Sequence, residues 1–184
     1  MHVDKSVHFC YTKYIVYKLS GAKMQELANY KTEIEKNGVI AFVPRGNSMW
    51  PFLKNKGQSV IIRKRISEER LEPFSVIFYE RSNGAFVLHR VLRLIDGGYV
   101  VCGDSQFELE KVEEEQIFGV MEGFYHGKKY IKATDSRYLK KVDKWYKKKT
   151  WRKFRINCFN FKNRVIGKLK RIAKKILRWE NKNV

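Results

Sequence analysis

Apolar residues recur along the first 135 positions with two different spacings. Residues 19–36 place them at helical spacing and are followed by Asn37-Gly38, which predicts an amphipathic helix that ends there. Short runs rich in β-branched and aromatic residues come next and predict strands at 39–43, 58–63, 75–79, 85–94, 99–102, 116–124 and 129–132. They are separated by the turn sequences Asn55-Lys56-Gly57, Ser82-Asn83-Gly84, Asp96-Gly97-Gly98 and His126-Gly127. Close strands joined by tight turns indicate a mainly β, α+β fold with a partly closed antiparallel sheet.

Helical spacing of apolar residues occurs again near the C-terminus. Apolar residues recur there at three- and four-residue intervals, between lysines and arginines, at Val165, Ile166, Leu169, Ile172, Ala173, Ile176 and Leu177. Thr134 or Asp135 is suited to cap the first helix of this region. We therefore expect three segments: residues 1–37 with the first helix, the β-rich domain 38–135, and a helical tail 136–184.

Charge separates the tail from the rest of the chain. Of the 39 Lys and Arg residues, 19 lie in residues 136–184 beside only two acidic residues, whereas residues 1–135 are nearly balanced. A basic amphipathic helix suits an anionic membrane surface, packing on the body of the protein, or nucleic acid. Of these three, the pattern favours peripheral contact with an anionic membrane, and nucleic acid is the least favoured partner.

Composition narrows the class of protein. With 43% hydrophobic residues the chain can build a core despite its net charge of +20. Three cysteines without metal-ligand spacing favour a reducing compartment and argue against a disulfide framework or a zinc site, and we expect no cofactor. The sequence shows no convincing export signal and no membrane-spanning run, so we expect a cytoplasmic protein that contacts the inner face of the membrane through its tail.

Three stretches carry residues suited to chemistry. They are Arg45-Gly46-Asn47-Ser48-Met49-Trp50-Pro51-Phe52 after one strand, Val87-Leu88-His89-Arg90-Val91 within another, and Tyr99-Val100-Val101-Cys102-Gly103-Asp104-Ser105-Gln106 at the end of the next. Serine hydrolysis needs a hydroxyl on a stiff turn, a base to take its proton and an acid to orient that base. Ser48, His89 and Asp104 could fill these three roles.

The sequence around these residues resembles that of the signal peptidase I family and of the self-cleaving LexA-type repressors. Gly46-Asn47-Ser48-Met49 is similar to the G-x-S-M motif around their nucleophile, and Pro51 matches the S-M-x-P spelling of signal peptidases. His89-Arg90 resembles the signal peptidases in which His replaces the Lys base, and Gly103-Asp104 matches their G-D. The likeness covers residues 38–124 and is nearest to small soluble bacterial members that lack a membrane anchor and end in a basic tail.

This resemblance implies a serine endopeptidase that cleaves a leader or exported peptide near the membrane. Ser48 would be the nucleophile, His89 the base, and Asp104 the acid that holds the imidazole. The Ser48 backbone N–H would provide one oxyanion donor. A peptide substrate, with small residues before the scissile bond, would lie as an added strand beside 39–43 or 86–91.

The sequence departs from the family pattern at two places. Gly46 stands where many signal peptidases have a hydroxyl residue that stabilises the oxyanion, so the second donor must come from elsewhere. Endoplasmic-reticulum-type enzymes also carry a further acid after G-D. If that later acid orients the base, Glu108 or Glu110 replaces Asp104 in the role.

Structural explanations compete with the catalytic ones. Ser48 could cap a helix, His89 could be a core histidine, Asp104 a turn residue, and Arg90 the partner of a buried acid. At the level of function, the alternative is a catalytically silent or self-cleaving regulatory or binding protein that uses its basic tail on membrane or nucleic acid. Residues 1–37 are too short for the DNA-binding domain of a repressor, which disfavours that version.

Overall fold

The first helix packs against a large sheet, nearest to the strand that follows it in the chain. A computed structural model describes residues 25–54 and 58–180, in which α1 spans Gln25–Asn37. Gly38 ends the helix in the left-handed region, with φ of 72°, and its N–H bonds the Ile34 carbonyl oxygen at 2.9 Å, as expected for a helix-ending glycine. The predicted helix is thus confirmed from residue 25 onward, and residues 19–24 lie outside the described residues.

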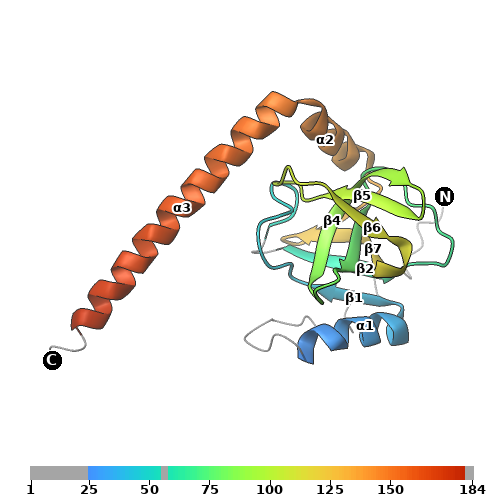
Figure 1. Ribbon diagram of the computed structural model, residues 1–184, viewed down its shortest axis with the longest axis horizontal. Helices are drawn as coiled ribbons and strands as arrows, with labels where there is room; N and C mark the ends of the chain where they lie inside the picture. Colours follow the sequence, from blue (N-terminus) through green and yellow to red (C-terminus); the bar gives the residue numbers. More distant parts are fainter. Residues whose placement is uncertain (1–24, 55–57, 181–184) are drawn as a thin grey trace. The chain divides into compact units, whose positions relative to one another are not determined.

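The remainder of the body is an eight-stranded sheet in which every pairing is antiparallel. The strand order is β1-β2-β7-β3-β4-β5-β6, and β8 pairs with β7 (Figure 1). The strands are β1 Val39–Phe42, β2 Gln58–Lys64, β3 Val76–Glu80, β4 Phe86–Ile95, β5 Gly98–Cys102, β6 Glu110–Glu113, β7 Ile117–His126 and β8 Lys129–Lys132. A short 3-10 helix, Glu114–Gln116, links β6 to β7.

All the predicted strands are present, and the α+β class with an antiparallel sheet is confirmed. The sheet is open and not partly closed as expected, because no pairing within the described residues joins β1 to β6. Strand β6 was not predicted, since its sequence Glu-Lys-Val-Glu has a single apolar residue. The predicted turn at 55–57 lies outside the described residues.

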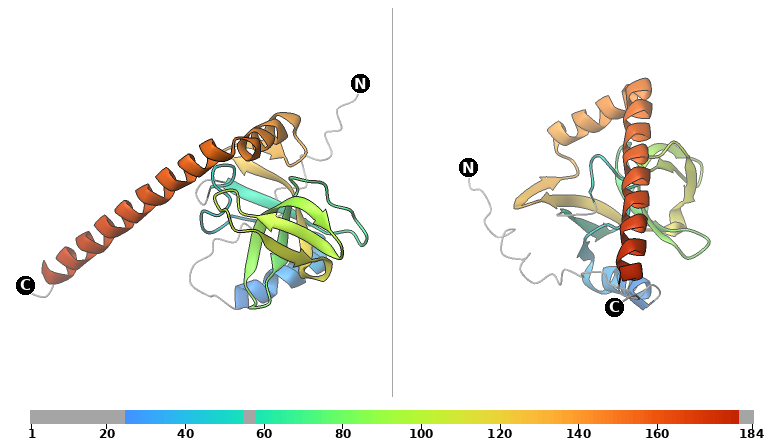
Figure 2. Two further views of the ribbon diagram at one scale, coloured as in Figure 1. Left: turned by 45° about the horizontal axis from the view of Figure 1, so that its top comes forward. Right: turned by 90° about the vertical axis from the view of Figure 1, so that its left-hand side faces the viewer.

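Two apolar clusters stabilise the sheet, which is strongly twisted (Figure 2). One surrounds β5, whose five residues are all buried, and consists of Leu71, Ile77, Tyr79, Val91, Tyr99, Val101, Val112, Ile117 and Val120. The other is aromatic and lies where α1 meets the sheet: the Phe78 ring is 5.2 Å from that of Phe42 and 6.0 Å from that of Tyr30. Burying aromatic rings contributes much of a core's hydrophobic free energy, so this second cluster holds α1 beside β1 and β3.

The chain divides into two compact units after Val142, within helix α2. Helix α2 spans Ser136–Lys147 and begins as predicted, because the Asp135 carboxylate accepts a hydrogen bond of 2.8 Å from the Tyr138 N–H. Helix α3 spans Lys149–Glu180 and confirms the helical tail. Apolar side chains are exposed along it at Phe154, Phe161, Val165, Leu169 and Ile172. Within the described residues, no helix has the length and apolarity needed to cross a bilayer.

Candidate active site

Ser48 lies on a tight turn that follows β1. Gly46 has φ of 83°, a conformation that favours glycine, and it turns the chain out of the strand. Met49 and Leu53 are buried and anchor the segment, and the Met49 carbonyl oxygen accepts the N–H groups of Phe52 and Leu53 at 3.1 and 2.9 Å. Ser48 lies within this turn, at residues 48–52, and no helix begins there in the described residues. The hydroxyl is instead carried on a rigid, half-buried loop.

The Gly-Asp-Ser segment after β5 clamps this loop. The Ser105 N–H donates to the Ser48 carbonyl oxygen at 2.8 Å, and the Ser105 hydroxyl donates to the Asn47 carbonyl oxygen at 2.6 Å. A Cβ atom on Gly103 would lie 2.9 Å from the Ser48 carbonyl oxygen and 2.5 Å from Gln106 Oε1. Glycine is therefore required at 103 for the two loops to approach so closely, and the approach fixes the position of Ser48.

His89 and Arg90 are neighbours on β4 and so point to opposite faces of the sheet. His89 pairs with Ile77 of β3, and Arg90 pairs with Val76 of β3 and Cys102 of β5. His89 is 1% exposed and lines the same cavity as Ser48, whereas Arg90 is fully buried on the other side. Ser48 and His89 thus line the same cavity, as the catalytic hypothesis requires.

One nitrogen of His89 is held by an acid and a phenol. Its Nδ1 lies 3.0 Å from Glu110 Oε1 and 3.2 Å from the Tyr79 hydroxyl, whose proton goes to Glu110 Oε2 at 3.0 Å. Because an ionised carboxylate only accepts hydrogen bonds, His89 carries its proton on Nδ1 and keeps the lone pair on Nε2. Burial lowers the pKa of His89 below its ordinary value of 6.5, and it outweighs the opposing effect of Glu110. The imidazole is therefore a neutral base near pH 7.

Arg81 fixes Glu110 in its charged form. The guanidinium donates to both carboxylate oxygens, with Nε at 2.7 Å and Nη2 at 2.5 Å. Partial burial raises the pKa of Glu110, but the hydrogen bonds from Arg81 and Tyr79 outweigh this effect, so the net shift of the pKa is downward. Burial, together with the Glu110 charge, raises the pKa of Tyr79, which stays protonated. Glu110 is thus a permanent anion aimed at His89.

Asp104 does not orient His89, and its assignment to that role is corrected. Both of its carboxylate oxygens accept hydrogen bonds of 2.7 Å from Arg90, and both residues are 0% exposed. Arg90 also donates to the Phe74 carbonyl oxygen at 2.8 Å and to the Tyr138 hydroxyl at 2.9 Å. A buried guanidinium needs a paired anion, and Asp104 serves that need. The alternative acid Glu110 occupies the position on His89, while Glu108 has no part in these contacts.

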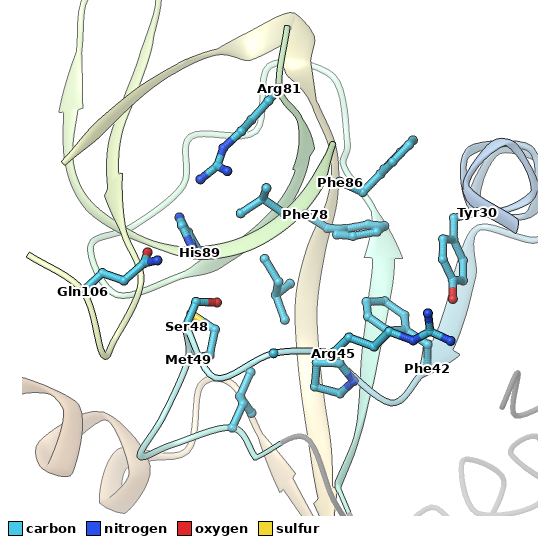
Figure 3. A pocket seen from close by; sticks show the side chains of 15 residues that line it. Tyr30, Phe42, Arg45, Ser48, Met49, Phe78, Arg81, Phe86, His89 and Gln106 are labelled. Atoms are coloured by element: carbon cyan, nitrogen blue, oxygen red, sulfur yellow. The ribbon is translucent and has the colours of Figure 1, made fainter. Parts of the chain in front are cut away.

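The cavity beside Ser48 has a volume of about 380 Å³, within the range of small-molecule and peptide side-chain pockets. Figure 3 shows Ser48, His89 and Gln106 at one end and Tyr30, Phe42 and Arg45 at the other. Aromatic and aliphatic side chains form most of the wall between these ends: Met49, Leu53, Phe78, Phe86, Val87 and Leu88. The Ser48 hydroxyl thus lies at the end of a mostly apolar cavity that could accept an apolar side chain.

The remaining singled-out residues have structural positions. Cys102 is buried on β5 as expected, and His126 bonds Gln58 at the far end of the sheet. Across residues 25–54 and 58–180, no group of His, Cys, Asp or Glu side chains could hold a metal ion. Sequence reasoning missed Tyr79 and Arg81. The hairpin turn at 82–84 could have indicated Tyr79, since it aligns Tyr79 with Val87 and so places it diagonally across from His89.

No protein-family model matches the chain, and no curated protein sequence is similar to it.

Proposed function

We propose that the protein is a serine endopeptidase with a Ser48–His89–Glu110 catalytic site. The observation that carries the proposal is that Ser48 and His89 line one cavity while Glu110 occupies Nδ1 of the imidazole. Three elements far apart in sequence supply these groups, in the roles that acyl transfer to serine requires. The order of motifs, which resembles that of the signal peptidase and LexA clan, also supports this reaction and that fold.

The reaction would proceed by attack of Ser48 Oγ on a peptide carbonyl carbon. His89 Nε2 takes the hydroxyl proton, and Glu110 stabilises the imidazolium that forms. The Ser48 N–H would donate to the oxyanion, and the carbonyl oxygen of the same peptide, that of Asn47, accepts a hydrogen bond of 2.6 Å from the Ser105 hydroxyl. The proton then passes to the leaving amine, and water attacks the acyl-enzyme with His89 again as base.

Two open strand edges support a peptide substrate. β4 pairs with β5 only from Arg90 onward, so Phe86–His89 pair on the β3 side alone. β1 pairs only with β2 among the described strands. Both segments contribute side chains to the cavity, so an extended peptide added to either edge would pass over Ser48.

The test maps the peptide N-termini present in host cells that express wild-type protein, Ser48→Ala or Ser67→Ala. Ser67→Ala is the control, because it changes an exposed loop serine. We expect a set of N-termini that disappears in Ser48→Ala and persists in Ser67→Ala. A synthetic peptide spanning such a site should then be cleaved by purified wild type and not by Ser48→Ala. Coincident maps for all three folded proteins would remove the peptidase proposal.

A further inference from the structure

A second cavity lies beside the loop that carries Ser48. It has a volume of about 920 Å³ and is lined by the end of that loop, by β7 and β8, and by the start of α2. The same loop therefore borders both cavities: Ser48 and Met49 line the first, and Phe52 and Lys54 line the second. We call this second cavity the basic cleft, defined by Pro51, Phe52, Lys54, Gln58, Phe124, His126, Lys129, Tyr130, Ile131, Lys132, Thr134, Asp135, Arg137, Tyr138 and Lys141.

The basic cleft concentrates positive charge that the protein does not neutralise. Five Lys and Arg residues line it: Lys54, Lys129, Lys132, Arg137 and Lys141. Within the described part of the chain, none of the five forms an ion pair. The single acid, Asp135, caps helix α2. Like charges around one cavity repel each other, and an anion bound among them relieves that repulsion.

The floor of the basic cleft is polar and ordered. Gln58 is 4% exposed, and its amide oxygen accepts the Lys54 N–H at 2.5 Å. That bond directs the amide nitrogen to His126 Nδ1 at 2.6 Å, so His126 carries its proton on Nε2 and adds an N–H donor to the lining.

Aromatic rings form part of the wall of the basic cleft. The Phe52 and Tyr138 rings meet edge to face at 5.9 Å, and the Phe124 and Tyr138 rings lie 5.3 Å apart. The Arg90 guanidinium lies over the faces of both the Phe52 and the Tyr138 rings, at 5.4 and 5.6 Å from their centroids, and so helps to fix them. The cleft thus combines several cations with a fixed aromatic surface.

We infer that the basic cleft binds a phosphate-bearing anion with at least two negative charges. Lysines on three separate elements can each contact a different phosphate oxygen, and Arg137 adds a planar fork that suits phosphate. The aromatic wall fits an apolar part of the same ligand. Both a phospholipid headgroup and a soluble phosphate ester have this chemistry. The inference concerns binding, and it stands whether or not Ser48 is a nucleophile.

The test is calorimetric titration of the full chain with tripolyphosphate at about 0.15 M salt, where distant charges are screened. The cleft variant is Lys129→Gln, Lys132→Gln and Lys141→Gln; the tail variant, Lys162→Gln, Lys168→Gln and Lys170→Gln, removes equal charge from exposed positions of α3. We expect the cleft variant to raise Kd at least about ten-fold and the tail variant to change it less than about two-fold. Equal weakening by both variants, or weakening by the tail variant alone, would overturn the inference.

A second arm identifies the source of the phosphate. The same three proteins are sedimented with vesicles containing phosphatidylglycerol, and their thermal unfolding midpoints verify that they are folded. If tripolyphosphate and vesicle binding both fall in the cleft variant, the cleft recognises a lipid headgroup. If only tripolyphosphate binding falls, the ligand is a soluble phosphate. A cleft variant that retains wild-type affinity in both arms contradicts the inference.

Discussion

Replacing Glu110 by Gln tests which acid serves His89. The substitution keeps the size of the side chain but removes the negative charge that lies 3.0 Å from Nδ1. Asp104→Asn is its matched comparison, because it makes the same chemical change in the buried partner of Arg90. The two variants should fail in different ways.

The expected loss for Glu110→Gln follows from the charge that forms during the reaction. An imidazolium and a carboxylate at 3.0 Å attract each other by about 5.5 kcal/mol at an effective dielectric constant of about 20. Arg81 shares the same carboxylate and the Glu110 side chain is 23% exposed, so we expect roughly half of that attraction to act on the transition state. A loss of about 2.7 kcal/mol lowers kcat about 100-fold.

Asp104→Asn should instead reduce stability. It leaves the Arg90 guanidinium buried without its anion, which typically costs about 3–5 kcal/mol. The folded fraction, however, retains the contact of Glu110 with His89 and the cavity that Ser48 and His89 line. We therefore expect a lower unfolding midpoint in urea and a kcat per folded molecule within a few-fold of wild type.

The assay is cleavage of a peptide that spans a mapped site, combined with urea unfolding of each variant. Glu110→Gln should lose kcat at nearly unchanged stability, and Asp104→Asn should do the reverse. A 100-fold loss of kcat in stable Asp104→Asn, with Glu110→Gln unaffected, would refute the assignment of Glu110.

Three further predictions concern protonation, packing and the tail. Because the pKa of His89 is lowered from 6.5, kcat/KM should decline with falling pH at a midpoint below 6.5, and a midpoint above 6.5 would contradict a buried neutral base. Gly103→Ala should lower the free energy of unfolding in urea by about 1–3 kcal/mol and remove most of the activity, because the new Cβ collides with the Ser48 carbonyl. The control is Gly167→Ala on α3, which has open space around it and should change neither stability nor activity. The double variant Leu169→Asn, Ile172→Asn keeps the net charge and should weaken binding to sedimented anionic vesicles about ten-fold. Ile66→Asn, on an exposed loop of the body, should leave vesicle binding unchanged. Equal vesicle binding by wild type and both variants would argue against insertion of the α3 apolar stripe.

The strands were predictable because most of them are short apolar runs between strong turn signals. β5 illustrates this: all five residues of Gly98–Cys102 are buried, so the run needs no alternation to be recognised. β6 could not be predicted, because its backbone pairing with β5 stabilises a strand whose side chains are mostly polar. That omission matters, since β6 begins with Glu110.

The choice between the two acids could not be made from sequence for the same reason. Asp104 follows Gly103 within a recognisable motif, whereas Glu110 gains its position only through the pairing of β6 with β5 and the ion pair with Arg81. Sequence order favours the nearer acid, but tertiary pairing selects the later one. The alternative that Arg90 pairs with a buried acid already implied that one nearby carboxylate would bind Arg90 and would not be available to orient His89.

Strand geometry explains why a His-Arg pair can serve one site. Successive residues on β4 face opposite sides, so the base enters the cavity while its neighbour reaches the far side of the sheet. There Arg90 binds Asp104, whose neighbours Gly103 and Ser105 position the Ser48 loop. The G-D-S segment thus contributes to the proposed catalysis by placing the nucleophile and not by touching the base. Loss of the Arg90–Asp104 pair should therefore act chiefly on stability, because neither residue contacts the proposed scissile bond and the hydrogen bonds from Ser105 still hold the Ser48 loop.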